Sequence, residues 1–235
     1  MPSSRHSRGG ATIASSGDGA RKSKTSLKQA AYNEIRRLIV TLQFAPGERV
    51  NEQIVSERIG IGKTPVRQAL QMLSTQGLVQ IIPRKGIRIV PDTLHDALSV
   101  LEARSAIEGE LARFAAQRAD PKILDQIEQN LSSSRRALKQ KDFEAFTRAD
   151  RGFHEIVAIA AGNAILSETL NALHDRIARI WHLRTWKLDH LEKTQEEHTA
   201  VFRAIAARDA DTAASAMRTH LDTLRKSIVD ARIVT

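Results

Sequence analysis

The amino-acid sequence predicts a mainly α-helical protein with one short β-hairpin, and three observations lead to this fold class. Apolar residues recur at helical spacing through most of the chain after residue 26. Only residues 78–91 hold two short runs rich in β-branched side chains, and these runs flank a turn that contains Pro and Gly. Pro, Gly or short polar breaks separate the helical segments.

The composition excludes several classes of protein. The chain of 235 residues has no cysteine, so it forms no disulfides, and any metal site must use His and carboxylate ligands. No apolar run approaches the roughly 20 residues that a membrane-spanning helix needs, and no signal peptide is recognisable. We therefore expect a cytoplasmic protein that does not associate with membranes.

Residues 1–25 are rich in Ser, Gly and Arg and have no hydrophobic periodicity. A segment of this composition buries too little apolar surface to compensate for the entropy lost when a chain becomes ordered. We predict that residues 1–25 form a disordered basic tail. The folded chain is expected to begin at Ser26, whose side chain can cap a helix.

Three short helices and the hairpin are expected in residues 26–91. The first helix, "LKQAAYNEIRRLIVTLQ", ends before the Pro–Gly turn "FAPGERV". Asn51 caps a second helix that ends at Gly60, and Pro65 lies in the first turn of a third, where Pro is tolerated. The hairpin "LVQIIPRKGIRIVP" follows. This order of elements predicts a winged helix-turn-helix domain.

The charge of the chain is concentrated in its N-terminal part. Residues 1–91 hold 15 Lys and Arg against 5 Asp and Glu, a net charge of +10, whereas residues 92–235 hold 21 against 22, a net charge of −1. Without the tail, residues 26–91 still hold ten basic residues against four acidic ones. This asymmetry indicates a polyanionic partner for the N-terminal part, most often nucleic acid.

In a winged helix-turn-helix domain the third helix enters the major groove of double-stranded DNA, and its first residues face the base edges. Arg can contact guanine through two hydrogen bonds and Gln can contact adenine, while Thr can reach phosphate or base. The tip of the hairpin reaches the minor groove or the backbone, and a glycine there permits close approach of the main chain. The predicted DNA contacts are Lys63, Thr64, Arg67, Gln68, Arg84, Lys85 and Gly86.

Residues 27–91 resemble the signature of the GntR-type regulators. The matching stretch is "APGERVNEQIVSERIGIGKTPVRQALQMLSTQGLVQIIPRKGIRIV". It has the Pro–Gly turn, the Thr-Pro-Val-Arg start of the third helix and a wing in which a basic residue precedes Gly. The resemblance implies DNA contacts at Thr64, Arg67 and the wing. Gly62 stands where the family usually has Ser, so a helix cap is lost, and Lys63 and Gln68 replace Arg and Glu. The DNA sequence read by this chain is expected to differ accordingly.

Residues 92–235 are predicted to form an all-α bundle of about six helices. The segments have helical periodicity, and Pro121, Gly162 and a polar "RDAD" stretch interrupt it. The expected spans are 93–119, 121–140, 142–161, 163–186, 188–208 and 210–231.

Four polar side chains lie on the apolar faces of these helices. Asp150 and His154 share one stripe with Phe146 and Phe153, and His198 and His220 lie on the stripes of the last two helices. Burying these groups without partners would cost several kcal/mol. Either a hydrogen-bonded core network or a divalent cation would satisfy them, since Asp and His four residues apart can chelate one ion.

The segment 93–230 resembles the FCD domain, the effector domain of FadR-type members of the GntR family. The matching motifs are "RSAIE", "DRGFH", the helix-opening Asn163, "EEH" and "THL". The resemblance implies that this is a ligand-binding domain and that Asp150, His154, His198 and His220 bind a metal. We expect zinc, with nickel, manganese and iron as alternatives for this donor set.

Arg104 lies on an apolar stripe of the first helix of the bundle. A metal bound by three His and one Asp keeps open positions, and an Arg beside it offers a fork for a carboxylate. One interpretation is that a small organic acid bridges the metal and Arg104. The other is that Arg104 forms a structural ion pair with Glu108 or Asp150.

These expectations predict a DNA-binding transcriptional regulator that binds a palindromic operator as a homodimer and responds to a small carboxylate. One alternative is a regulator that senses the metal ion itself. A metal-dependent hydrolase is another, because an open metal position can activate water. Against an enzyme, we find no general base beside the ligands, since Glu197 points to a different helix face from its neighbour His198.

Overall fold

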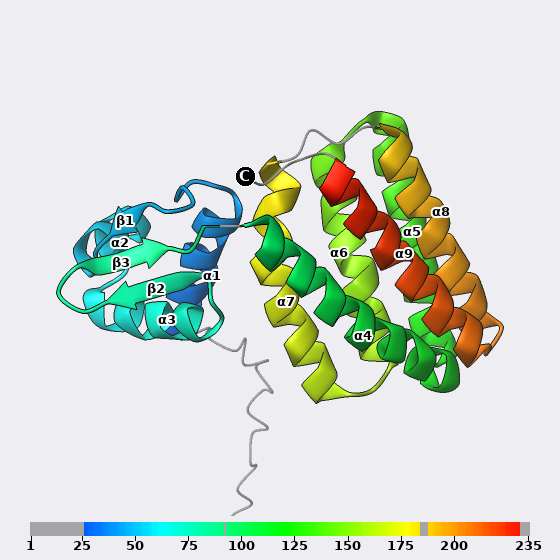
Figure 1. The fold of residues 1–235 in the computed structure, drawn as a ribbon. Helices are drawn as coiled ribbons and strands as arrows, with labels where there is room; N and C mark the ends of the chain where they lie inside the picture. Colours follow the sequence, from blue (N-terminus) through cyan, green and yellow to red (C-terminus); the bar gives the residue numbers. More distant parts are fainter. Residues whose placement is uncertain (1–25, 92, 184–187, 231–235) are drawn as a thin grey trace, which may run out of the picture.

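The structure, a computed structural model, describes residues 26–91, 93–183 and 188–230. Within these ranges it contains nine helices and one small antiparallel sheet, which confirms the mainly α fold class. Figure 1 shows the sheet and the first three helices together on one side and the bundle of the later helices on the other. The tail predicted for residues 1–25 lies outside the described ranges.

The smaller part of the molecule has the three predicted helices. The side chains of Ser26 and Asn51 cap the first two, as predicted, by accepting hydrogen bonds from the backbone N–H groups of Gln29 at 3.2 Å and Ile54 at 2.8 Å. Gly60 ends the second helix in a left-handed conformation. The helices are α1 (Leu27–Val40), α2 (Glu52–Ile59) and α3 (Lys63–Thr75).

The predicted hairpin belongs to a three-stranded sheet. Strands β2 (Val79–Ile82) and β3 (Gly86–Ile89) pair as expected, and β1 (Arg49–Val50) adds to the other edge of β3, in the order β1-β3-β2. The expectation that "FAPGERV" is only a turn was therefore wrong at its end, because two residues are too few to show strand periodicity.

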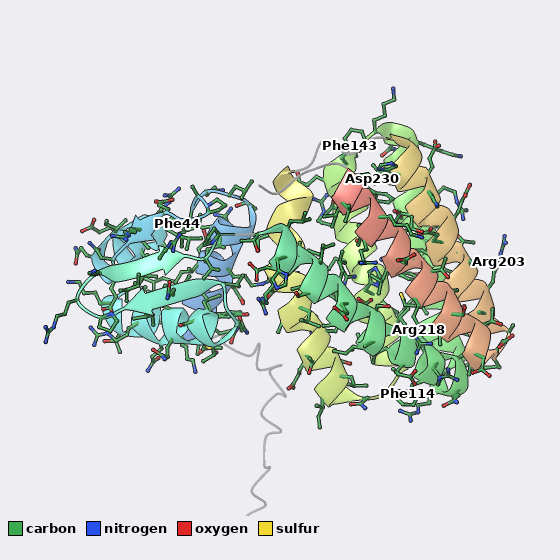
Figure 2. All side chains as sticks on the ribbon, viewed as in Figure 1. Phe44, Phe114, Phe143, Arg203, Arg218 and Asp230 are labelled. Atoms are coloured by element: carbon green, nitrogen blue, oxygen red, sulfur yellow. The ribbon has the colours of Figure 1, made fainter. Side chains whose placement is uncertain are left out.

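A compact apolar cluster joins the sheet to α1, α2 and α3. Its centre includes Ile35, Leu70 and Phe44, all almost fully buried, and Figure 2 labels Phe44 in this part of the molecule. The guanidinium of Arg58 lies over the Phe44 ring at 4.7 Å from its centroid. This packing fixes α3 against the sheet, so that the start of α3 and the hairpin tip belong to one rigid unit.

The larger part of the described chain is a bundle of six helices, as predicted. Helix α4 packs along α9, α5 packs on α6, and α8 packs on α9 (Figure 1). Its main apolar cluster runs through the middle and includes Ala112, Phe153 and Met217. The helices are α4 (Leu94–Arg118), α5 (Pro121–Gln140), α6 (Phe143–Ala160), α7 (Ala164–Leu183), α8 (Leu188–Ala206) and α9 (Ala210–Asp230).

None of the helices in the described ranges is both long and apolar enough to cross a membrane.

Candidate functional site

Four of the seven residues predicted to contact DNA lie together on one side of the smaller part. Lys63 and Arg67 at the start of α3 and Arg84 and Gly86 in the hairpin line a groove of about 460 Å³. Thr64, Gln68 and Lys85 are exposed but do not line this groove. The fold thus brings the first turns of the expected recognition helix and the wing to a common surface.

Two glycines shape this surface. Gly62 precedes α3 and gives it no side-chain cap, as expected from the missing Ser. Gly86 has a φ of +90°, and a Cβ built there would lie 2.8 Å from the carbonyl oxygen of Val50. The pairing with strand β1 therefore requires a glycine at this position, and the close approach of Gly86 to DNA stays a prediction.

Arg67 is held by an acidic side chain from the preceding helix. Its Nε and Nη2 atoms donate to the two carboxylate oxygens of Glu52, each at 2.8 Å. The Arg67 side chain is nevertheless 72% exposed. Sequence reasoning did not single out Glu52.

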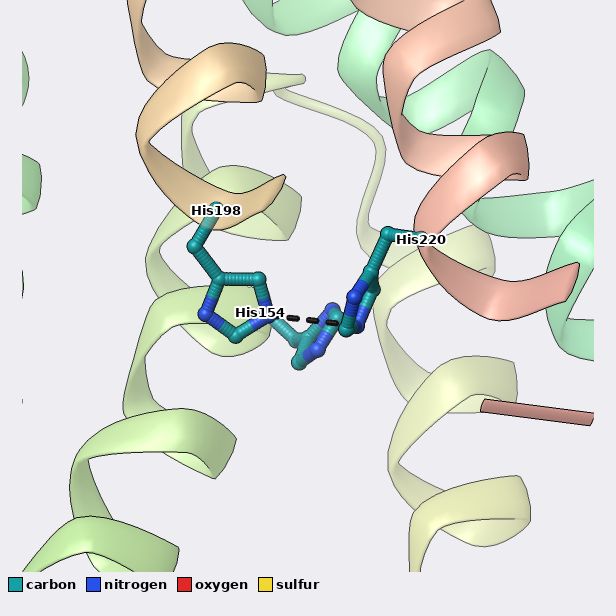
Figure 3. Close-up of side chains that lie close together, drawn as sticks. All are labelled: His154, His198 and His220. Atoms are coloured by element: carbon teal, nitrogen blue, oxygen red, sulfur yellow. Dashed lines mark hydrogen bonds between the residues drawn. The ribbon is translucent and has the colours of Figure 1, made fainter. Parts of the chain in front are cut away.

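Three buried imidazoles meet in the centre of the bundle. His154 from α6, His198 from α8 and His220 from α9 each offer a nitrogen, and these atoms lie within 4.8 Å of one another (Figure 3). The Nε2 atoms of His198 and His220 are 3.1 Å apart. Asp150 stands at the edge of this group, with Oδ1 3.7 Å from Nε2 of His198. The structure thus brings together all four residues predicted as metal ligands.

Carboxylates lie behind two of these imidazoles. Oε2 of Glu197 is 3.0 Å from Nδ1 of His220, and Oε2 of Glu108 is 2.5 Å from Nδ1 of His154. Glu197, whose contact with the ligands the sequence did not predict, reaches across from α8 to the ring of His220 on α9. Since Glu197 meets Nδ1 of His220, Nε2 of that ring is left to face the other imidazoles.

Arg104 forms the structural ion pair that was one of its two interpretations. Its Nε donates to Oε1 of Glu108 at 2.6 Å, and both side chains are almost fully buried. Burial alone would raise the pKa of Glu108, but attraction to Arg104 and to His154 outweighs it and holds that pKa well below its ordinary value. Glu108 is therefore a buried carboxylate anion.

Burial favours the neutral form of two neighbouring imidazoles, those of His198 and His174. It lowers the pKa of His198 well below its ordinary value, and the nearby His220 lowers it further. Burial, followed by the charge of Arg104, lowers the pKa of His174 on α7 to about 3. A neutral imidazole has a lone pair on one nitrogen, which is the form that binds metal ions.

Several polar atoms in this region lack hydrogen-bond partners. Both ring nitrogens of His174 have none, and Nδ1 of His154 is not aligned with Oε2 of Glu108 despite their short separation, so that these two atoms are also unsatisfied. Buried polar groups are normally hydrogen-bonded, and each exception is costly. This part of the bundle therefore has unused capacity to bind a small polar group.

A chain of ion pairs connects this region to the smaller part of the molecule. Asp175 on α7 is 4% exposed and accepts a hydrogen bond from Nε of Arg36 on α1 at 2.5 Å. Arg36 also contacts the other carboxylate oxygen through Nη2. Nη1 of Arg151 on α6 lies 3.0 Å from Asp175, and Arg151 directly follows Asp150 in the chain. No pattern in the sequence pairs these helices.

Comparisons with known proteins give a matching family for each of the two parts of the chain. Residues 27–89 match the family described as bacterial regulatory proteins, gntR family, and residues 99–223 match the FCD domain. The HTH-type transcriptional repressor RspR of Escherichia coli (strain K12) is 31% identical over 209 residues, which cover 88% of this chain and 90% of RspR. The HTH-type transcriptional repressor GlaR of the same strain is 26% identical over 202 residues, covering 81% of this chain and 90% of GlaR.

Solved structures show the same fold. E. coli McbR/YncC superposes with a TM-score of 0.79 at 18% identity and covers 89% of this chain and 100% of its own. A putative transcriptional regulator GntR from Rhodococcus sp. RHA1 gives a TM-score of 0.72 at 19% identity, covering 87% and 98%. The chain therefore belongs to the GntR family of bacterial regulatory proteins, as a DNA-binding transcriptional regulator with an FCD domain.

Proposed function

We propose that the FCD domain of this regulator binds one divalent metal ion through Asp150, His154, His198 and His220, and that a small organic acid bound there changes its affinity for operator DNA. The observation that carries this proposal is the group of three buried imidazoles whose nitrogens lie within 4.8 Å. The facing Nε2 atoms of His198 and His220 can share at most one proton when both rings are neutral, whereas one cation can accept a lone pair from each of the three imidazoles.

The surrounding residues fit a metal. Glu197 favours the His220 tautomer that carries its proton on Nδ1, which leaves the lone pair of Nε2 for the ion. Phe153 stacks on His198 with ring centroids 4.1 Å apart and holds its orientation. Zinc suits three imidazoles and a carboxylate, and nickel, manganese and iron are the alternatives. When bound, the ion would supply a Lewis-acidic centre for a carboxylate ligand.

Arg104 is the proposed second contact of the organic acid. Glu108 occupies its Nε edge, so that the Nη1 and Nη2 atoms are the ones that can meet a carboxylate. The charge of Arg104 lowers the pKa of both His174 and His198, which supports its position beside the imidazole cluster. His174, with two unsatisfied nitrogens, would lie near the polar part of the same ligand.

We propose that this site senses and does not catalyse. Of the two carboxylates next to these imidazoles, Glu197 faces Nδ1 of His220 and Glu108 faces Nδ1 of His154, so that both lie behind the rings with respect to the proposed ion. A general base for a metal-bound water would have to lie on the other side. The similarity to transcriptional repressors points in the same direction.

At the DNA-binding end, we propose that residues 26–91 form one domain and residues 92–235 another, and that the regulator acts in the cytoplasm. The exposed start of α3 and the wing support contact with double-stranded DNA. A homodimer would present two such surfaces to a palindromic operator. The proposed DNA contacts are Lys63, Thr64, Arg67, Gln68, Arg84, Lys85 and Gly86.

Operator binding should depend on the ligands of the FCD domain. A duplex selected by the protein from a random library serves as operator, and its affinity is measured by fluorescence anisotropy for metal-free and zinc-, nickel- and manganese-loaded protein, with a panel of small mono- and dicarboxylates. We expect at least one acid to change the Kd about fivefold or more, and only on metal-loaded protein. A change caused by metal alone would identify a metal sensor, and a Kd indifferent to metals and acids would refute the proposal.

We further propose that Asp175 transmits this change. Arg151 lies between Asp150 and His154 on α6, and His174, next to Asp175 on α7, contacts the His154 ring edge to face at 5.5 Å. A shift of α6 against α7 on ligand binding would therefore move the partners of Asp175, which also holds Arg36 of α1. Such a contact can couple the two parts, because each arrangement favours a different set of ion pairs.

Asp175→Asn should uncouple the two parts. The variant keeps the size of the side chain but loses the charge that binds Arg36 and Arg151, so the ratio of operator Kd with and without the ligand should fall towards one. Glu155→Gln is the matched control, since it removes an exposed partner of the same Arg151 within α6. Calorimetry of metal binding should give wild-type affinity for both variants. A wild-type Kd ratio in Asp175→Asn would show that the ion pairs of Asp175 do not couple the two parts.

A further inference from the structure

The contact between Glu52 and Arg67 places a negative charge on the surface that faces DNA. Glu52 is the first residue of α2, and its side chain is 31% exposed in the groove that Lys63, Arg67 and the wing also line. A carboxylate in this position repels phosphate groups and so weakens binding to any DNA sequence. A role of Glu52 that offsets this loss of affinity for DNA would explain why the carboxylate is there.

The geometry of the pair indicates that role. An arginine as exposed as Arg67 would otherwise lose rotamer entropy when it binds a base. The two 2.8 Å hydrogen bonds to Glu52 fix the guanidinium before DNA arrives. They use the N–H of Nε and one N–H of Nη2, so that three of the five N–H donors remain, on Nη1 and Nη2 at the end of the side chain.

These remaining donors match one base. Guanine presents two acceptors, O6 and N7, in the major groove, and the two terminal nitrogens of an arginine can donate to both. Adenine presents a donor where guanine has O6, so a fixed fork of donors rejects it. Glu52 accepts hydrogen bonds from one edge of Arg67 and leaves the other edge aligned for guanine.

We propose that Glu52 is a specificity-determining residue, which positions Arg67 to read a guanine in each half of the operator. The inference rests on the proposed contact between Arg67 and DNA. It assigns to Glu52 a loss of general affinity for DNA together with a gain in discrimination between bases. A carboxylate that only supported the fold or only repelled DNA would change affinity for all sequences alike.

The test compares base preferences across variants of the full-length protein. Wild type, Glu52→Gln, Arg67→Ala and Glu57→Gln are each used to select duplexes from a random library, and the bound fractions are sequenced. Glu57→Gln is the matched control, because it removes the same charge from α2. The Glu57 side chain is paired with Gln53 and not with Arg67. Thermal unfolding of each variant checks that the domain is folded.

We expect Glu52→Gln to reduce the preference for guanine at one position of each half-site by roughly 10-fold. Affinity for unselected DNA should rise slightly, as it should for Glu57→Gln, whose base preferences stay those of wild type. Base preferences of Glu52→Gln that equal those of Glu57→Gln would overturn the role of Glu52. If Arg67→Ala also kept the wild-type preferences, the contact between Arg67 and the base would itself be refuted.

Discussion

His198→Leu should lower the affinity of the FCD domain for divalent metal by more than about 100-fold. Loss of a group that merely hydrogen-bonds a metal ligand already costs roughly 10- to 100-fold, and His198 is proposed as a ligand itself. Leucine is suitable because it cannot bind the ion and can still pack against Phe153, which stacks on the native ring. Isothermal titration with zinc, in competition with a chelator, measures the affinity.

Unfolding gives an independent measurement of the same loss. A ligand present at 100 times its Kd stabilises the native state by about 2.7 kcal/mol, so wild type should melt at a higher temperature with zinc than with a chelator, whereas His198→Leu should not. His95→Ala is the control, since this exposed imidazole lies on α4 away from the cluster. Wild-type zinc affinity in His198→Leu would show that the three imidazoles form a network without a metal.

Glu108→Gln should destabilise the FCD domain by about 3–5 kcal/mol. Removing one partner of a buried ion pair leaves the other charge uncompensated in a low-dielectric interior, and here Arg104 is 2% exposed and Glu108 1%. For a chain of this size the melting temperature should fall on the order of 10 °C. Thermal unfolding followed by circular dichroism in the presence of a chelator separates this effect from metal binding.

Two further variants identify the cause. Glu110→Gln removes an acidic group from the same helix, but its partner Arg218 lies on the surface (Figure 2), so the change should be much smaller. Arg104→Met combined with Glu108→Leu should recover most of the lost stability, because apolar side chains often replace a buried ion pair without cost. Equal melting temperatures of Glu108→Gln and Glu110→Gln would mean that the buried charge is compensated in another way.

Periodicity was sufficient to predict the helices and the inward faces of the proposed metal ligands. A side chain on the apolar stripe of a helix must face the core, and His154, His198 and His220 are 2%, 1% and 3% exposed. That these three meet at one point does not follow from periodicity, because the relative rotation and height of three helices depend on packing. The resemblance to the FCD domain supplied that step.

The contacts made by long polar side chains were not predictable. Glu197 lies off the stripe of His198 yet reaches the ring of His220 on the next helix. Glu52 and Arg67 meet because α2 packs against α3. Asp175 meets Arg36 only because α7 touches α1. In each case the sequence identifies a charged side chain, but its ion-pair partner depends on how the helices pack in three dimensions.

The apolar clusters of this protein respect the division between its two parts. The cluster of the DNA-binding part contains only residues from 31 to 89, and the main cluster of the bundle only residues from 97 to 228. None of the buried apolar side chains that the structure describes belongs to both clusters, and the contact across the boundary includes the charges of Arg36 and Asp175. Amino-acid changes around the proposed metal and effector site can therefore accumulate during evolution without disturbing the packing that supports α3.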